Sequence, residues 1–109
     1  MDTTTERIRA LNDQLRTVGR GGNIVVTRGI AALDLSTKAA VFAAVQAFDQ
    51  FSADNDPYGE HDFGLLEVCG ERIMFKVDYY NTTMSGLSPD PADPNVTRRV
   101  LTILLASEY

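Results

Sequence analysis

Residues 63–80 place the strongest constraint on the fold, because two independent patterns in this segment select the same β-hairpin. With Cys69 and Gly70 as a two-residue turn, Glu67 lies opposite Arg72 on one face of the hairpin. The same register gathers apolar residues on the other face, namely Leu66, Val68, Ile73, Phe75, Val77 and Tyr79. Cysteine is unusual at the first position of such a turn, so a longer turn is the alternative. The agreement of charge and apolar patterns predicts this hairpin as the centre of the core.

The N-terminal part of the chain predicts a helix followed by a short strand. The first helix carries apolar residues on one face at helical spacing, namely Ile8, Leu11, Leu15 and Val18. Gly19 is a typical helix stop. The β-branched run from Ile24 to Thr27 favours a strand, which Gly29 ends.

Two further helices are predicted, one before the hairpin and one at the end of the chain. Ser36 is suited to cap the second helix, whose apolar positions are Val41, Ala44, Val45 and Phe48. Asp93 and Pro94 predict the start of the last helix, with Asp at the cap and Pro at the first helical position. Its apolar stripe is wider than one core face requires, and it consists of Val96, Val100, Leu101, Ile103, Leu104 and Leu105. A homodimer through this helix is therefore an alternative to burial within one chain.

These elements predict a single α+β domain over residues 1–109, in the order α-β-α-β-β-α. A chain of 109 residues is long enough to bury one core without disulfides. The short strand and the hairpin would form a small antiparallel sheet, packed by about three helices.

Residues 54–62 combine four carboxylates, the single histidine, a proline, a glycine and a tyrosine between two apolar segments. Acidic groups and tyrosine in a turn-rich segment are typical of recognition loops, since tyrosine is enriched in contact surfaces. We predict a binding surface formed by this acidic loop and nearby polar residues: Asp54, Asp56, Tyr58, Glu60, His61, Asp62, Asp78, Tyr80 and Asp90.

Metal-dependent and nucleophilic chemistry are disfavoured by the spacing of these groups. A calcium loop would need an acidic residue where Leu65 stands, and neighbours along an extended segment at 60–62 cannot all converge on one ion. Cys69 is flanked by two glutamates, which disfavours its thiolate, and about 26 Å of strand separates it from His61. We therefore expect no catalytic residue, no metal and no cofactor. The alternative is a small-molecule or metal-binding domain, including a hydrolase, centred on His61.

The charge distribution indicates the type of partner. The net charge is −5, and residues 49–93 hold ten acidic residues against two basic ones. Such a surface repels nucleic-acid phosphates, so we expect a basic protein or nucleoprotein surface as the partner and no direct contact with nucleic acid. One cysteine fits a reducing compartment. Without a signal peptide or a long apolar run, the sequence predicts a cytoplasmic protein that makes no membrane contact.

Several long stretches of the chain resemble a bacterial family of domains of unknown function. They lie at 25–33, 47–49 with 55–64, 76–80, and 88–94 followed by 97–103. The resemblance covers nearly the whole chain and transfers no catalytic residue. It implies a family often encoded near plasmid and phage-derived genes. Taken with the acidic loop, it suggests an inhibitor or modulator of a nucleic-acid-handling system, of the anti-CRISPR or anti-restriction type. Its carboxylates would stand in for phosphates.

Overall fold

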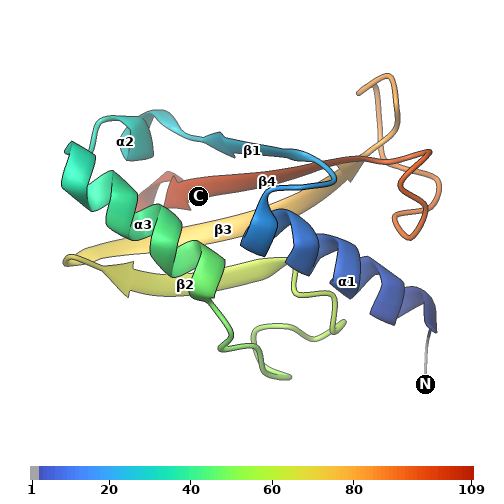
Figure 1. Ribbon diagram of the computed structural model, residues 1–109, viewed down its shortest axis with the longest axis horizontal. Helices are drawn as coiled ribbons and strands as arrows, with labels where there is room; N and C mark the ends of the chain where they lie inside the picture. The colour runs from blue at the N-terminus through green and yellow to red at the C-terminus, as the bar shows by residue number, and fades with distance from the viewer. Residues whose placement is uncertain (1–2) are drawn as a thin grey trace.

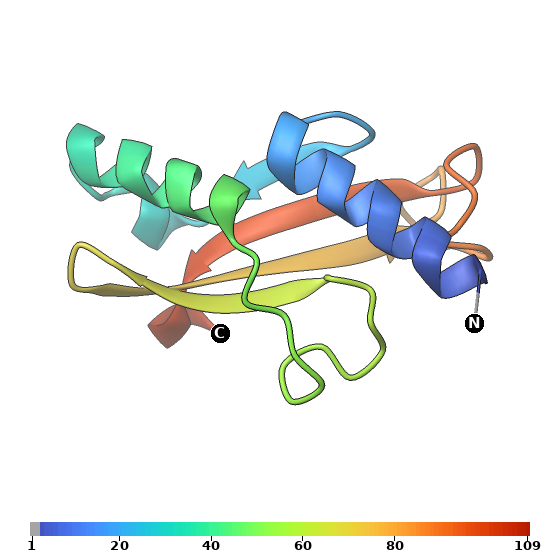
Figure 2. The same ribbon diagram turned by 60° about the horizontal axis from the view of Figure 1, so that its bottom comes forward.

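The computed structural model describes residues 3–109 as a four-stranded sheet with two long helices on one of its faces (Figures 1 and 2). The elements are α1 (Thr3–Val18), β1 (Asn23–Val26), α2 (Arg28–Ala31), α3 (Leu35–Ala47), β2 (Phe63–Val68), β3 (Glu71–Tyr80), β4 (Arg98–Leu105) and the 3-10 turn η1 (Ala106–Glu108). The predicted α+β class is confirmed. None of the described helices is long and apolar enough to cross a membrane.

The strand order is β1-β4-β3-β2, and the sheet is mixed. β1 pairs with β4 in parallel, whereas β4 with β3 and β3 with β2 are antiparallel. The prediction of a purely antiparallel sheet is therefore wrong. The last strand enters the sheet between β1 and β3, in the same direction as β1, and this arrangement makes one pair parallel.

The predicted hairpin is confirmed in its register. Glu67 pairs with Arg72, and Leu66 pairs with Ile73. The turn residue Cys69 has φ of 52° and the next residue, Gly70, has φ of 81°. Two consecutive positive φ values are the mark of the tight turn that matches the twist of a hairpin, so the longer turn is not used.

The predicted last helix is wrong, because its residues form the strand β4. Asp93 and Pro94 lie in a turn before it. β4 lies between two other strands, and residues of both its faces are buried: Leu101 and Ile103 on one face, Leu104 on the other. Burial on both faces explains why the apolar stripe is wider than a helix with one buried face requires. The homodimer predicted through a last helix therefore has no such helix to use.

The other helices differ from prediction in their ends and faces. α3 begins one residue after Asp34, whose carboxylate accepts a hydrogen bond from the Thr37 backbone N–H at 2.7 Å, so Asp34 caps it in place of Ser36. α1 ends at Val18, directly before the predicted stop at Gly19, and the Val18 side chain, predicted on the apolar face, is 61% exposed. The short helix α2 was not predicted.

The core lies between the two long helices and the sheet (Figure 2). It consists of Leu15, Ile30, Val41, Val45, Phe48, Val68, Ile73, Phe75, Val77, Leu101 and Ile103. The rings of Phe48 and Phe75 meet edge to face, with centroids 5.3 Å apart. The predicted apolar face of the hairpin thus supplies the sheet side of this core.

Candidate functional site

The connection between α3 and β2 projects beyond the edge of the sheet, as the light-green segment of Figures 1 and 2 shows. We call residues 49–62 the acidic loop. It contains five acidic residues and no lysine or arginine. The predicted recognition segment, residues 54–62, forms its second part.

His61 anchors the acidic loop to α1. Its Nδ1 lies 2.8 Å from the carboxylate of Asp13, and its ring stacks on Phe51 with centroids 3.8 Å apart. The Nε2 atom lies 3.8 Å from the carboxylate of Asp56, which also accepts the His61 backbone N–H at 3.1 Å. The residue adopts φ of 55°, a conformation that few residues other than glycine occupy without support. His61 therefore fixes the course of the loop and pairs with acids, one of them on a distant element.

Two side chains of α1 hold the backbone of the same loop. The Arg9 Nε donates to the Gly59 carbonyl at 2.7 Å, and the Asn12 Nδ2 donates to the Glu60 carbonyl at 3.0 Å. These bonds satisfy carbonyl groups that a projecting loop would otherwise leave to solvent. The second part of the loop thus has a defined shape.

A buried polar network lies behind the loop, between α1 and the ends of β3 and β4. Asn12 is fully buried, and its Nδ2 also donates to the Tyr79 hydroxyl at 2.8 Å. That hydroxyl donates to the Glu60 carboxylate at 2.7 Å, while the Arg99 Nε donates to the Asn12 Oδ1 at 2.6 Å. Arg99 also donates to the Pro91 carbonyl and lies over the Tyr79 ring at 5.1 Å. The network connects five separate parts of the chain: α1, the acidic loop, β3, the loop that contains Pro91, and β4.

Burial sets the charge states around this network. Burial, followed by the hydrogen bond to Glu60, raises the pKa of Tyr79 far above its ordinary value, so the phenol stays neutral. Burial lowers the pKa of Arg99, against the opposing effects of Tyr79 and Glu60. Burial also raises the pKa of Asp62, and the nearby charge of Glu60 adds to this effect. Burial therefore disfavours the charged forms of both Arg99 and Asp62 at this site.

The nine predicted site residues divide into three groups. Asp56, Glu60 and His61 lie together, but their side chains face inward and hold the loop. Asp54 and Tyr58 are exposed, and Tyr58 is exposed over 76% of its surface.

The remaining four residues do not form one patch with that exposed pair. Asp62 is half-buried, and Asp78 accepts from the Lys76 ammonium at 2.5 Å on β3. Tyr80 lies at the end of β3, opposite Arg98. The Asp90 carboxylate accepts from the Ala92 backbone N–H at 3.1 Å in a different loop.

The sequence interpretation missed five residues that build this site: Asn12, Asp13, Arg16, Phe51 and Arg99. Arg16 donates to the Asp13 carboxylate at 3.0 Å and lies over the Phe51 ring at 5.1 Å. Asn12 had a local signal, since an amide one turn after Ile8 on an apolar helix face needs a buried partner. The others join the site through contacts across the fold.

Within residues 3–109, no three His, Cys, Asp or Glu side chains are grouped so as to hold a metal ion. Cys69 is exposed in the hairpin turn.

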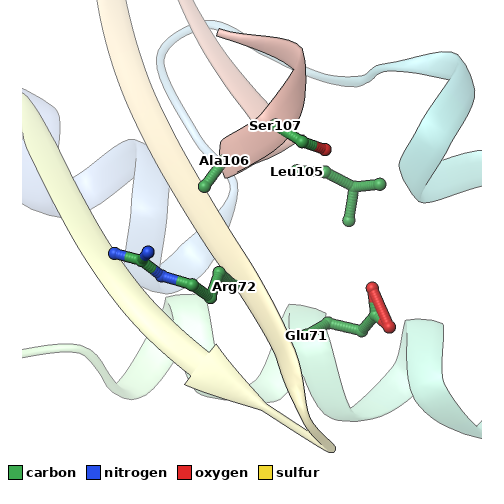
Figure 3. Close-up of a pocket in the computed structure, with 5 residues that line it drawn as sticks. All are labelled: Glu71, Arg72, Leu105, Ala106 and Ser107. Atoms are coloured by element: carbon green, nitrogen blue, oxygen red, sulfur yellow. The ribbon is translucent and has the colours of Figure 1, made fainter.

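A separate pocket of about 320 Å³ lies at the other end of β3, beside η1 (Figure 3). Its lining residues are Glu71, Arg72, Leu105, Ala106 and Ser107. Glu71 and Arg72 extend from opposite sides of β3, so their charges do not meet at one point (Figure 3). The pocket is distinct from the acidic loop.

Comparison with protein families identifies the chain by class. Residues 26–108 match the family described as "Protein of unknown function (DUF3768)", and the chain belongs to this family. The match includes the acidic loop and all four strands in whole or in part, but it leaves out α1. Comparisons with curated proteins and with solved structures gave no match.

Proposed function

We propose that this protein is a non-enzymatic binding protein that presents the acidic loop to a basic protein or nucleoprotein surface. The proposal rests on one observation: some side chains of the loop are buried or bonded within it, whereas others are exposed to solvent. His61 and Asp56 fix it from within, whereas Tyr58 and Asp54 stand in solvent. A loop fixed before binding loses little conformational entropy on association.

Charge supports the same type of partner. Five acidic residues without a basic one give the loop a negative field that speeds association with a positive surface. Tyr58 adds an exposed aromatic side chain, the kind that often anchors an interface.

The more specific form of the proposal is an inhibitor of a nucleic-acid-handling system, of the anti-CRISPR or anti-restriction type. Its carboxylates would occupy a surface that otherwise binds phosphates, so it would act by protein–protein contact. An association of the family with plasmid and phage-derived genes is part of this proposal.

A hydrolase centred on His61 is the second candidate, since an aspartate 2.8 Å from a histidine Nδ1 is the arrangement that orients catalytic imidazoles. However, the Nε2 atom, which would act on a substrate, faces the buried carboxylate of Asp56. The ring also stacks on Phe51. These contacts favour an anchoring role.

Cleavage assays with purified RNA-guided nucleases and restriction endonucleases test the proposal. The loop variant should be Asp54→Lys with Tyr58→Ala, because changes at Asp56 or Glu60 would disturb internal bonds. Glu67→Lys with Leu65→Ala, both exposed on β2, is the matched control.

We expect the native protein and the control to inhibit cleavage, and the loop variant to lose at least about tenfold in potency. Inhibition should also weaken with salt, because the Debye length falls to about 8 Å at physiological ionic strength. Equal inhibition by all three proteins would contradict the role of the loop. A hydrolytic activity lost in His61→Gln would favour the second candidate.

A further inference from the structure

β1 forms one border of the sheet, and its outer edge is open (Figure 1). Among the strands of residues 3–109, β1 pairs only with β4, through the register from Asn23 with Val100 to Val26 with Ile103. An open edge presents unpaired backbone N–H and C=O groups, which can bind another extended chain.

The backbone direction shows which groups are free. The Thr27 N–H donates to the Ile103 carbonyl at 3.1 Å, toward β4. Because backbone groups alternate in direction along a strand, the N–H and C=O groups of Ile24 and Val26 point away from the sheet.

The side chains of this edge are apolar and accessible. Ile24, Val25 and Val26 are exposed over 39%, 44% and 38% of their surfaces. None of the three carries the charge that commonly protects an edge strand from pairing. The edge can therefore offer both hydrogen bonds and apolar contact.

Positive charge flanks the strand on both sides. Arg20 precedes β1 and Arg28 follows it, and both are exposed. The segment from 14 to 33 contains no acidic residue. Glu108 lies beside the end of the strand, and its carboxylate already accepts from the Thr27 hydroxyl and from the Gly29 and Leu105 N–H groups.

We propose that the edge of β1 binds an extended acidic peptide segment as an added strand. The backbone of the peptide would pair with Ile24 and Val26, and its terminal carboxylates would meet Arg20 and Arg28. This is strand addition, in which backbone bonds give affinity and the flanking side chains give selectivity. The site is separate from the acidic loop, which lies beyond the β2 edge.

Charge favours this occupant over a second copy of the chain. An antiparallel twofold pairing of two β1 strands would place Arg20 of one copy near Arg28 of the other. Like charges opposed at an interface disfavour the complex, whereas an acidic peptide meets a cation at each end.

Fluorescence anisotropy with two labelled hexapeptides tests the proposal. One has the sequence Glu-Val-Thr-Val-Thr-Glu, and the other replaces both glutamates with lysine. The protein variants are Val26→Pro, which removes an outward N–H, and Arg20→Glu with Arg28→Glu. Arg7→Glu with Arg72→Glu, two exposed arginines elsewhere, is the charge-matched control.

We expect the acidic peptide to bind the native protein and the control equally. The acidic peptide should bind both β1 variants at least about tenfold more weakly than it binds the native protein. The lysine peptide should bind the native protein at least about tenfold more weakly than the acidic peptide does. If Val26→Pro does not fold, as judged by circular dichroism, the charge variant and the peptide exchange still decide the question.

Two results would overturn the proposal. One is equal affinity for both peptides, or no saturable binding of the acidic one. The other is sedimentation showing self-association that Val26→Pro abolishes, which would make a second copy the occupant of the edge.

Discussion

Asn12 shows how one side chain positions a site whose parts are distant in the chain. Its amide nitrogen serves the Glu60 carbonyl and the Tyr79 hydroxyl, and its oxygen accepts from Arg99. These partners lie 48, 67 and 87 residues away in sequence. An amide suits this position because it donates and accepts at once, which neither a carboxylate nor an aliphatic side chain does.

Replacing Asn12 with Ala should lower the free energy of unfolding by about 2–4 kcal/mol, because it leaves the Nε of the buried Arg99 without its acceptor and a cavity beside the phenol. Gln14→Ala on the exposed side of the same helix is the control, with an effect within about 0.5 kcal/mol. Urea unfolding measures both. A loss below about 1 kcal/mol for Asn12→Ala would show that the network contributes little.

Asp62 predicts a pH dependence of stability. Burial raises its pKa above the ordinary 3.8, so the folded protein binds the proton more tightly than the unfolded chain does. Above the pKa of the folded state, ionisation of Asp62 therefore lowers the free energy of unfolding. The free energy of unfolding recovers as the pH falls through that pKa. Asp62→Asn should stabilise the protein at pH 7, and its advantage should shrink as the pH approaches 4.

Denaturant unfolding at several pH values measures this difference. Asp54→Asn, which removes the same charge from an exposed position, is the control and should show a smaller change with pH. An Asp62→Asn advantage that stays constant with pH would mean that ionisation of Asp62 is not its source.

At the scale of elements, the β2–β3 pair combines a local turn with a close packing contact. Gly64 lies directly across from Phe75, and a Cβ at this position would overlap the Phe75 ring. The ring is fully buried and meets Phe48 and Phe51 edge to face. The absence of a side chain at Gly64 therefore creates the space that the central ring of the core occupies.

Gly64→Ala should cost about 1–3 kcal/mol of stability through overpacking. Adding Phe75→Leu should recover part of that loss, so the two changes together should cost less than their sum. Gly86→Ala, in an exposed loop with only one side-chain atom 3.8 Å away, is the control. Strict additivity in urea unfolding would show that the ring and the glycine do not share this space.

At the scale of the whole molecule, the sheet separates two borders of different character. The β1 border is apolar with arginines on both sides, and the acidic loop projects at the β2 border. β4 lies between β1 and β3 and carries hydrogen bonds on both sides. The centre of the sheet should be its most stable part, and the β1 border its most accessible.

Native-state hydrogen exchange tests this order. The amides of Thr102 and Leu104, which point toward the central strand β3, should exchange only through global unfolding, whereas those of Ile24 and Val26 should exchange fast. The Thr27 amide, which directly follows β1 but donates to the Ile103 carbonyl, is the internal control and should exchange more slowly. Strong protection of Ile24 and Val26 in dilute protein would show that the edge is already covered.

The sequence by itself determined the hairpin register and the end of the first helix. In the hairpin, the turn, the Glu67–Arg72 pair and the apolar alternation all act within 18 residues, so local patterns were sufficient. Only the tertiary structure decided β4, since its dense apolar run satisfies helical and strand spacing alike. Pairing with β1 and β3 settled the choice. The tertiary structure also decided the site. The composition of residues 54–62 predicted the loop, but Asn12 and Asp13 contact it from 48 residues away, and no local pattern encodes such a contact.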